Sequence, residues 1–134
     1  MKKILFVSLL FLVFCQVKAG QWIRVNQLGY LPDARKVAVF MSEEPMSVDR
    51  FELKDAFTHA TVLTFNSVKS AGKYGRMSST YRLNFTAFEG VGSFYLAAGK
   101  ATSPVFRINA HVYDGTADFL LTYMRQQRCG YNPW

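Results

Sequence analysis

Alternating apolar and polar positions mark most of the chain beyond residue 20 as short β-strands. The pattern is clearest where Phe51 and Leu53 alternate with Glu52 and Lys54, because a period of two is typical of a strand with one buried face. Turn residues recur at about ten-residue spacing, which predicts an all-β fold with an antiparallel β-sandwich, and a small barrel is the alternative. Strand character is found in residues 22–26, 36–41, 50–55, 61–65, 81–86, 92–98 and 104–108.

The segments differ in the surroundings that they predict. Residues 22–26 direct Ile23 and Val25 toward a core, whereas residues 36–41 are apolar on both faces and predict a central strand covered from two sides. The short turn at residues 58–59 predicts a hairpin between its flanking strands. Residues 66–80 are rich in glycine, serine and basic side chains, so we expect a long mobile loop there.

From Asp114 the period changes from that of a strand to that of a helix. Acidic residues lie near the start of this segment, arginines lie near its end, and Gly130 and Pro133 then stop it. One face of the helix carries Phe119, Leu120, Tyr123, Met124 and Gln127. Such a helix either covers a face of the sandwich or belongs to a second, helical domain, and its periodicity alone does not choose between them.

Residues 1–19 have the features of a signal peptide. Two lysines precede an apolar run at residues 4–14, and small residues surround the expected cleavage site after Ala19. We therefore expect a protein that is secreted, periplasmic or on the cell surface, with an uncleaved signal anchor as the alternative. Lipid attachment at Cys15 has less support, because the large Phe14 precedes it.

Composition excludes few classes of protein. Loss of the leader removes three lysines and lowers the formal charge from +7 to +4, and the remaining basic residues form no run. Nucleic acid and, after cleavage, a membrane are therefore not expected as partners. Cys129 is left without a second cysteine, so no internal disulfide is expected.

Two motifs resemble a known family of enzymes. Residues 23–30, Ile-Arg-Val-Asn-Gln-Leu-Gly-Tyr, with Lys-Val-Ala-Val at 36–39, resemble the start of the immunoglobulin-like domain that precedes the catalytic domain in family-nine glycoside hydrolases, the cellulase or endoglucanase class. Residues 123–133, Tyr-Met-Arg-Gln-Gln-Arg-Cys-Gly-Tyr-Asn-Pro, resemble the first helix of that catalytic domain and the loop after it.

This resemblance implies a domain organisation. Residues 1–19 are a signal peptide, residues 20–110 an immunoglobulin-like sandwich, and residues 111–134 a linker and the first helix of a catalytic domain that is truncated in this chain. The expected partner is the missing helical domain of the same polypeptide, and a polysaccharide is a further candidate. The residues expected at the interface between the two domains are Gln27, Tyr30, Phe119, Leu120, Tyr123, Met124 and Gln127.

Candidate catalytic chemistry is missing from the sequence. Glycosidic cleavage needs two carboxyl groups, an acid and a base or nucleophile, yet Asp114 and Asp118 suit a helix N-terminus better than a catalytic pair. The resemblance places the catalytic acid and the Asp-Ala-Gly-Asp base motif in the helical domain, and neither occurs here. His59 and His111 lack neighbours at ligand spacing, so no metal and no other cofactor is expected.

A sugar-binding role has limited support. Aromatic rings stack on sugar rings, and Trp22, Tyr30, Tyr74 and Trp134 are candidates for such a platform. Most other aromatic side chains occupy inward strand positions, which favours core packing. Two functions remain open: an inactive accessory domain of a secreted glycoside hydrolase acting on β-glucan such as cellulose, and a free-standing secreted carbohydrate-binding or adhesion module.

Overall fold

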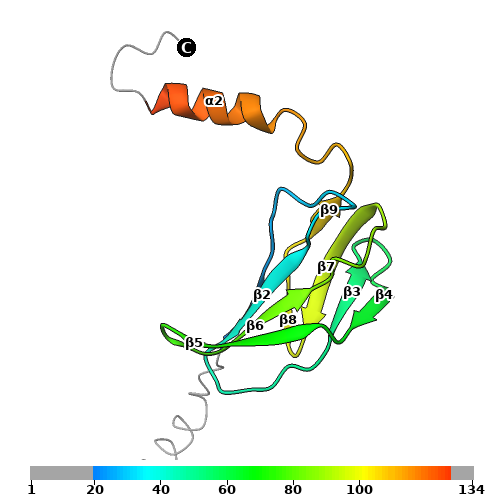
Figure 1. Ribbon diagram of the computed structural model, residues 1–134, viewed down its shortest axis with the longest axis vertical. Helices are drawn as coiled ribbons and strands as arrows, with labels where there is room; N and C mark the ends of the chain where they lie inside the picture. The colour runs from blue at the N-terminus through cyan, green and yellow to red at the C-terminus, as the bar shows by residue number, and fades with distance from the viewer. Residues whose placement is uncertain (1–19, 128–134) are drawn as a thin grey trace, which may run out of the picture.

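The computed structural model describes residues 20–127, which form a β-sandwich followed by one helix (Figure 1). Residues 1–19, where a signal peptide is predicted, and residues 128–134, with Cys129, Gly130 and Pro133, lie outside the described residues. The elements in chain order are β1 (Gln21–Arg24), β2 (Val37–Ser42), β3 (Phe51–Asp55), β4 (Thr61–Phe65), β5 (Val68–Tyr74), β6 (Met77–Asn84), β7 (Gly92–Ala98), β8 (Ala101–Thr102), β9 (Phe106–Ile108) and α2 (Thr116–Gln126).

Two antiparallel sheets enclose a single hydrophobic core. Sheet A has the strand order β1-β2-β6-β5, and sheet B has the order β4-β3-β7-β8 with β9 also paired to β7. Figure 1 shows β2, β6 and β5 on one side of the sandwich and β7, β3 and β4 on the other. Alternate side chains of both sheets point inward, as pleated strands require. This confirms the predicted antiparallel sandwich, and the barrel alternative is wrong. The largest buried apolar side chains are Phe40, Phe51, Phe85, Phe106, Ile23, Leu53, Leu83, Leu96 and Ile108.

Strand β2 is central in sheet A, as predicted, but the prediction that both of its faces are covered is wrong. Ala38 and Phe40 are buried in the core, whereas Val39, between them, is 39% exposed. A sandwich has one core between two layers, so the outer face of each sheet meets solvent unless another element covers it. Nothing in the described chain covers this part of sheet A.

The expected loop at residues 66–80 is also wrong, because this segment forms the β5–β6 hairpin. Its turn is Gly75-Arg76, between the paired residues Tyr74 and Met77, and Gly75 has the positive φ of 55° that favours glycine. The strand β5 lies at the edge of sheet A and is irregular near Gly72. Its side chains are mostly exposed, so backbone hydrogen bonds to β6 hold it and no apolar pattern reveals it.

The β3–β4 hairpin confirms its prediction. Phe51 and Leu53 are buried at 1% and 0% exposure, and β3 pairs antiparallel with β4. Asp55 closes the turn: its carboxylate accepts backbone hydrogen bonds from Phe57 at 2.9 Å and Thr58 at 2.8 Å. These bonds lower the pKa of Asp55, because they stabilise the ionised form. His59 has a positive φ of 59°, which the turn imposes.

The start of the described chain is fastened to sheet A by a carboxylate. The backbone N–H of Gly20 donates to Glu43 Oε2 at 3.1 Å, and the N–H of Glu43 donates to the Gly20 carbonyl at 3.1 Å. Arg76, in the β5–β6 turn, pairs with the other oxygen of Glu43. The Gly20 N–H, followed by Arg76, lowers the pKa of Glu43.

Candidate interdomain interface

The turn that follows β1 is built by Asn26 and Gly29. The Asn26 Oδ1 accepts from the Leu28 N–H at 3.1 Å, while its Nδ2 donates to the Gly29 carbonyl at 2.8 Å. Asparagine favours such turns because its short side chain replaces a backbone partner. Gln27 and Leu28, at the tip, are exposed. The turn therefore presents one polar and one apolar side chain to solvent.

Gly29 is required by both its backbone angle and its surroundings. Its φ of +109° is one that other residues rarely adopt. A Cβ atom here would lie 2.4 Å from the Arg107 carbonyl oxygen and 2.5 Å from Val112 Cγ2. The backbone of this turn thus lies directly against the end of β9 and the segment that leads to α2.

Tyr30 was expected at the interface, but the structure places its side chain in the core, where it is 6% exposed. Its ring packs edge-on against Phe85 and Phe106, at centroid distances of 5.3 and 5.4 Å. The hydroxyl accepts from the Asn26 N–H at 3.0 Å and donates to the Val37 carbonyl at 3.2 Å. Burial raises the pKa of this hydroxyl, while the Asn26 bond opposes the shift. Tyr30 supports the turn from below and offers no ring to a partner.

The segment between β9 and α2 is fastened to the same turn. Tyr30 forms a parallel bridge with Ile108, and its carbonyl accepts from the Asn109 N–H at 3.1 Å. Tyr113 then reaches back: its hydroxyl donates to the Gly29 carbonyl at 2.8 Å and accepts from Asn26 Nδ2 at 3.1 Å. Sequence reasoning missed Tyr113. The one available signal is an aromatic residue with a hydroxyl group between the last strand and the helix.

Helix α2 confirms the predicted helix, and none of its residues is buried. Figure 1 shows it standing clear of both sheets. Its N-cap is Gly115, with a φ of 74° and no side-chain hydrogen bond, and Asp118 is the acid of its first turn. The interface candidates Phe119, Leu120, Tyr123 and Met124 are 74%, 54%, 55% and 66% exposed, and Gln127 is exposed as well. These apolar side chains thus share the helix, but they do not form one surface with Gln27 or Tyr30.

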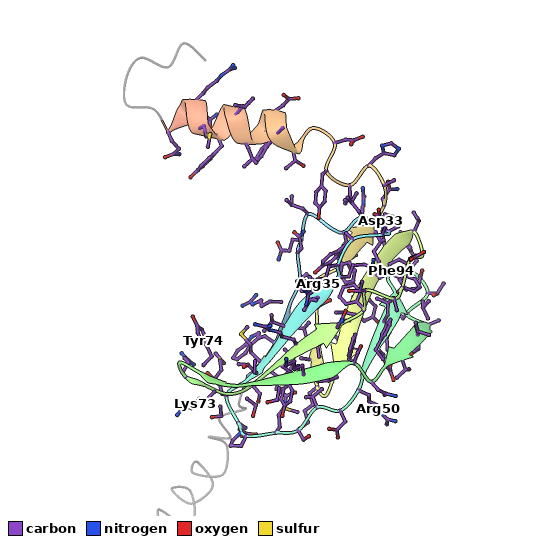
Figure 2. The ribbon with its side chains drawn as sticks, viewed as in Figure 1. Asp33, Arg35, Arg50, Lys73, Tyr74 and Phe94 are labelled. Carbon is purple, nitrogen blue, oxygen red and sulfur yellow. The ribbon has the colours of Figure 1, made fainter. Side chains whose placement is uncertain are left out.

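The four aromatic candidates for a sugar platform do not form one surface. Tyr30 is in the core, and Trp134 lies outside the described residues. Trp22 is half-buried on β1, while the register places Gly72 of β5 across three strand spacings from it, about 14 Å. Tyr74 lies further along β5, at the hairpin tip (Figure 2), where it is 76% exposed. Stacking by a row of rings is therefore not available.

The described carboxyl groups with shifted pKa values have lowered pKa values, which does not suit a general acid. Hydrogen bonds from Gly20 and Arg76 lower the pKa of Glu43, and those from Lys54 and Thr61 lower the pKa of Glu52. A glycosidase acid needs the opposite, a raised pKa, so that it holds its proton. Residues 20–127 contain no cluster of three or more side chains that could hold a metal ion, and no helix long and apolar enough to cross a membrane.

Comparison with known proteins agrees with this architecture. A GH9 protein of Bacteroides ovatus is 30% identical over 78% of this chain and 18% of that chain, with a TM-score of 0.64. A metagenome-derived glycoside hydrolase family 9 endoglucanase is 26% identical over 85% of this chain and 23% of that one, with a TM-score of 0.60. An endoglucanase of Alicyclobacillus acidocaldarius, at 22% identity and a TM-score of 0.55 over 78% of this chain and 17% of that one, shows the shared fold alone.

The chain therefore spans less than a quarter of each of these proteins. The comparison with curated proteins finds no match. Residues 18–103, well over half of the chain, match the model of the cellulase N-terminal ig-like domain. This match does not reach residues 123–133, so their resemblance to the start of a catalytic domain stays a prediction. The resemblance drawn from residues 23–30 and 36–39 is confirmed, and the chain belongs to the family of cellulase N-terminal immunoglobulin-like domains.

Proposed function

We propose that residues 20–110 are a non-catalytic accessory domain of a secreted glycoside hydrolase that acts on β-glucan such as cellulose. The segment from residue 111 to residue 134 is then the linker and first helix of the helical catalytic domain. Family membership supports this organisation, as do the similar solved structures, in which the matching part is a small fraction of a longer chain. The leader pattern in residues 1–19 supports export.

The observation that carries the proposal is the exposed apolar face of α2. The sandwich closes its core without the helix, and none of the helix residues is buried. A separate helix of eleven residues is marginal in water, whereas burial of each large apolar side chain contributes about 1.5–3 kcal/mol. Phe119, Leu120, Tyr123 and Met124 therefore need a partner surface that the described residues do not provide, and a helical catalytic domain supplies one.

Thermal unfolding of two fragments tests this assignment. Residues 20–134 and residues 20–115 differ by the helix segment, and both keep Tyr113 with its bond to the Gly29 carbonyl. We expect nearly equal melting temperatures and better solubility for the shorter fragment, because the sandwich does not pack on the helix. A fall of about ten degrees or more on truncation would instead show that the helix is part of a self-contained module.

Activity provides a second test. The chain should release no reducing sugar from carboxymethylcellulose above the level of a heat-inactivated sample, because no described carboxyl pair suits glycosidic cleavage. Linking the chain to the polypeptide encoded downstream should give activity if that polypeptide contains the Asp-Ala-Gly-Asp motif. Hydrolysis by the present chain alone would contradict the accessory role.

A further inference from the structure

The outer face of sheet A is a basic surface without acidic residues. Its four strands contain Arg24, Lys69, Lys73 and Arg82 and no aspartate or glutamate. The strands of sheet B, in contrast, balance Glu52 and Asp55 against Lys54 and Arg107. The two layers of one sandwich thus differ in charge, although they share one core.

Strand register places three of the four cations of sheet A in one row. Arg24 is opposite Val39, Val39 is opposite Arg82, and Arg82 is opposite Lys69. All four residues are exposed, since their neighbours Ile23, Phe40, Leu83 and Val68 face the core. Adjacent strands are about 4.8 Å apart, so like charges at Arg82 and Lys69 are direct neighbours and repel each other.

No acid of the described chain neutralises this row. Residues 20–127 contain ion pairs at Lys54–Glu52, Arg76–Glu43 and His111–Asp114, and none of them includes Arg24, Arg35, Lys69 or Arg82. Figure 2 shows Arg35 beside β2, whereas Asp33 lies nearer the upper end of the sandwich. No ion pair within residues 20–127 thus offsets the repulsion within the row, and an anion bound there would relieve it.

A groove of about 320 Å³ lies at one end of this row and is lined by two of its cations, Lys69 and Arg82, together with Arg35 from the segment before β2. The remaining lining residues are Val37, Ser67, Val68 and Asn84. Asn84 Oδ1 accepts from the Thr86 N–H at 3.0 Å and the Thr86 hydroxyl at 2.7 Å, which fixes the amide and leaves its nitrogen to donate. The groove thus combines charged donors, an amide donor and aliphatic surface.

We propose that this groove binds an acidic polysaccharide through the carboxylates of its uronic acid residues. Arginine guanidinium groups pair with carboxylates through two parallel hydrogen bonds. The repeated cations along the row suit a polymer with repeated charges, and Val37 in the groove offers apolar contact to the C–H faces of sugar rings. No aromatic ring lines the groove, which disfavours single-stranded nucleic acid because its bases stack on aromatic side chains.

The test measures binding of the purified full chain to polygalacturonate by affinity electrophoresis and calorimetry at low salt. Hydroxyethylcellulose is the neutral control polymer, and single-stranded DNA is the non-sugar polyanion. We expect binding to polygalacturonate that weakens as salt screens the charges, and weaker binding to both control polymers. Equal binding to hydroxyethylcellulose or to DNA would overturn the proposal.

A matched pair of variants locates the site. Lys69→Gln with Arg82→Gln removes two charges from the groove, and Lys100→Gln with Arg107→Gln removes two exposed charges associated with sheet B. We expect at least about tenfold weaker polygalacturonate binding for the first variant and nearly unchanged binding for the second, with both melting temperatures preserved. Equal losses would show that net charge alone acts, and would overturn the proposal. Neither outcome bears on the accessory role, because no step of this test involves the helix or a catalytic domain.

Discussion

The sandwich and helix α2 place the same types of side chain in opposite surroundings. Phe85 and Leu53 are fully buried between the sheets, whereas Phe119 and Leu120 are 74% and 54% exposed. The sandwich is therefore complete in itself, and its stability comes from contacts between its two sheets. The helix has the composition of a buried element without a covering surface. Among residues 20–127, the apolar side chains of the sandwich are thus covered, whereas those of α2 are not.

The largest expected effect comes from the core. Phe85→Ala should lower the free energy of unfolding by about 3–5 kcal/mol, because it removes a ring that packs against both Tyr30 and Phe106 and leaves a cavity. Urea unfolding followed by circular dichroism measures this loss. Phe119→Ala is the control on the helix, and a comparable loss in that variant would mean that α2 is packed as firmly as the sheets.

The turn below the linker should give the next largest effect. Gly29→Ala forces a side chain into a positive φ and against the Arg107 carbonyl and Val112, with an expected cost of about 2–4 kcal/mol. Gly72→Ala is the matched control, since Gly72 has a φ of +77° but nothing within 4 Å of the added atom. Its cost should be about 1 kcal/mol. Similar losses in the two variants, measured by thermal unfolding, would show that the close approach of the linker has no energetic role.

A smaller effect on stability is expected from side-chain capping, in which the two regions differ. Asp55 caps the β3–β4 turn, whereas no side chain caps the start of α2. The pKa of Asp55 is lowered in the folded chain, chiefly by the Thr58 N–H. Its stabilising contribution is therefore complete above the ordinary aspartate value of 3.8 and is lost as the pH falls through the lower folded value.

Asp55→Asn should consequently make the loss of stability on acidification shallower, since asparagine keeps an acceptor oxygen but does not titrate. Melting temperatures recorded between about pH 2 and pH 7 compare the two proteins. An identical pH profile would mean that the carboxylate of Asp55 contributes nothing to the turn.

The smallest effect is expected on the helix itself. Replacing Phe119, Leu120 and Met124 together by serine should change the free energy of unfolding of the sandwich by no more than about 0.5 kcal/mol. Solubility should rise, because an exposed apolar patch is removed. Sedimentation and urea unfolding measure the two quantities. A loss of stability well beyond this range would place these side chains against the sandwich.

Much of the fold can be predicted from the sequence, because alternation of apolar and polar residues within a strand indicates which side chains are buried. Phe51 and Leu53 alternate with polar residues, so their strand, its inward face and its hairpin were all predicted. The apolar face of α2 was equally clear from its helical period. In both segments the signal depends on residues a few positions apart, which is the range over which a single sequence is informative.

The remaining features depend on partners that lie far away in the sequence. Strand β5 has few apolar residues and is held by pairing with β6, so its composition suggested a loop. The residues that flank Tyr30 in the sequence do not indicate whether its ring is buried or exposed. The basic row was hidden for the same reason, since only strand register places Arg24, Arg82 and Lys69 in one row.

The contact between Gly20 and Glu43 would change its chemical character if the leader is cleaved after Ala19, as the sequence predicts. Gly20 would then be the first residue, and its amide nitrogen would become a free ammonium group 3.1 Å from the Glu43 carboxylate. Proteolytic maturation would thus convert a backbone hydrogen bond into an ion pair, with Arg76 already holding the other carboxylate oxygen. The new N-terminus would fasten itself to the edge of the sandwich, where the uncleaved precursor offers only a neutral donor.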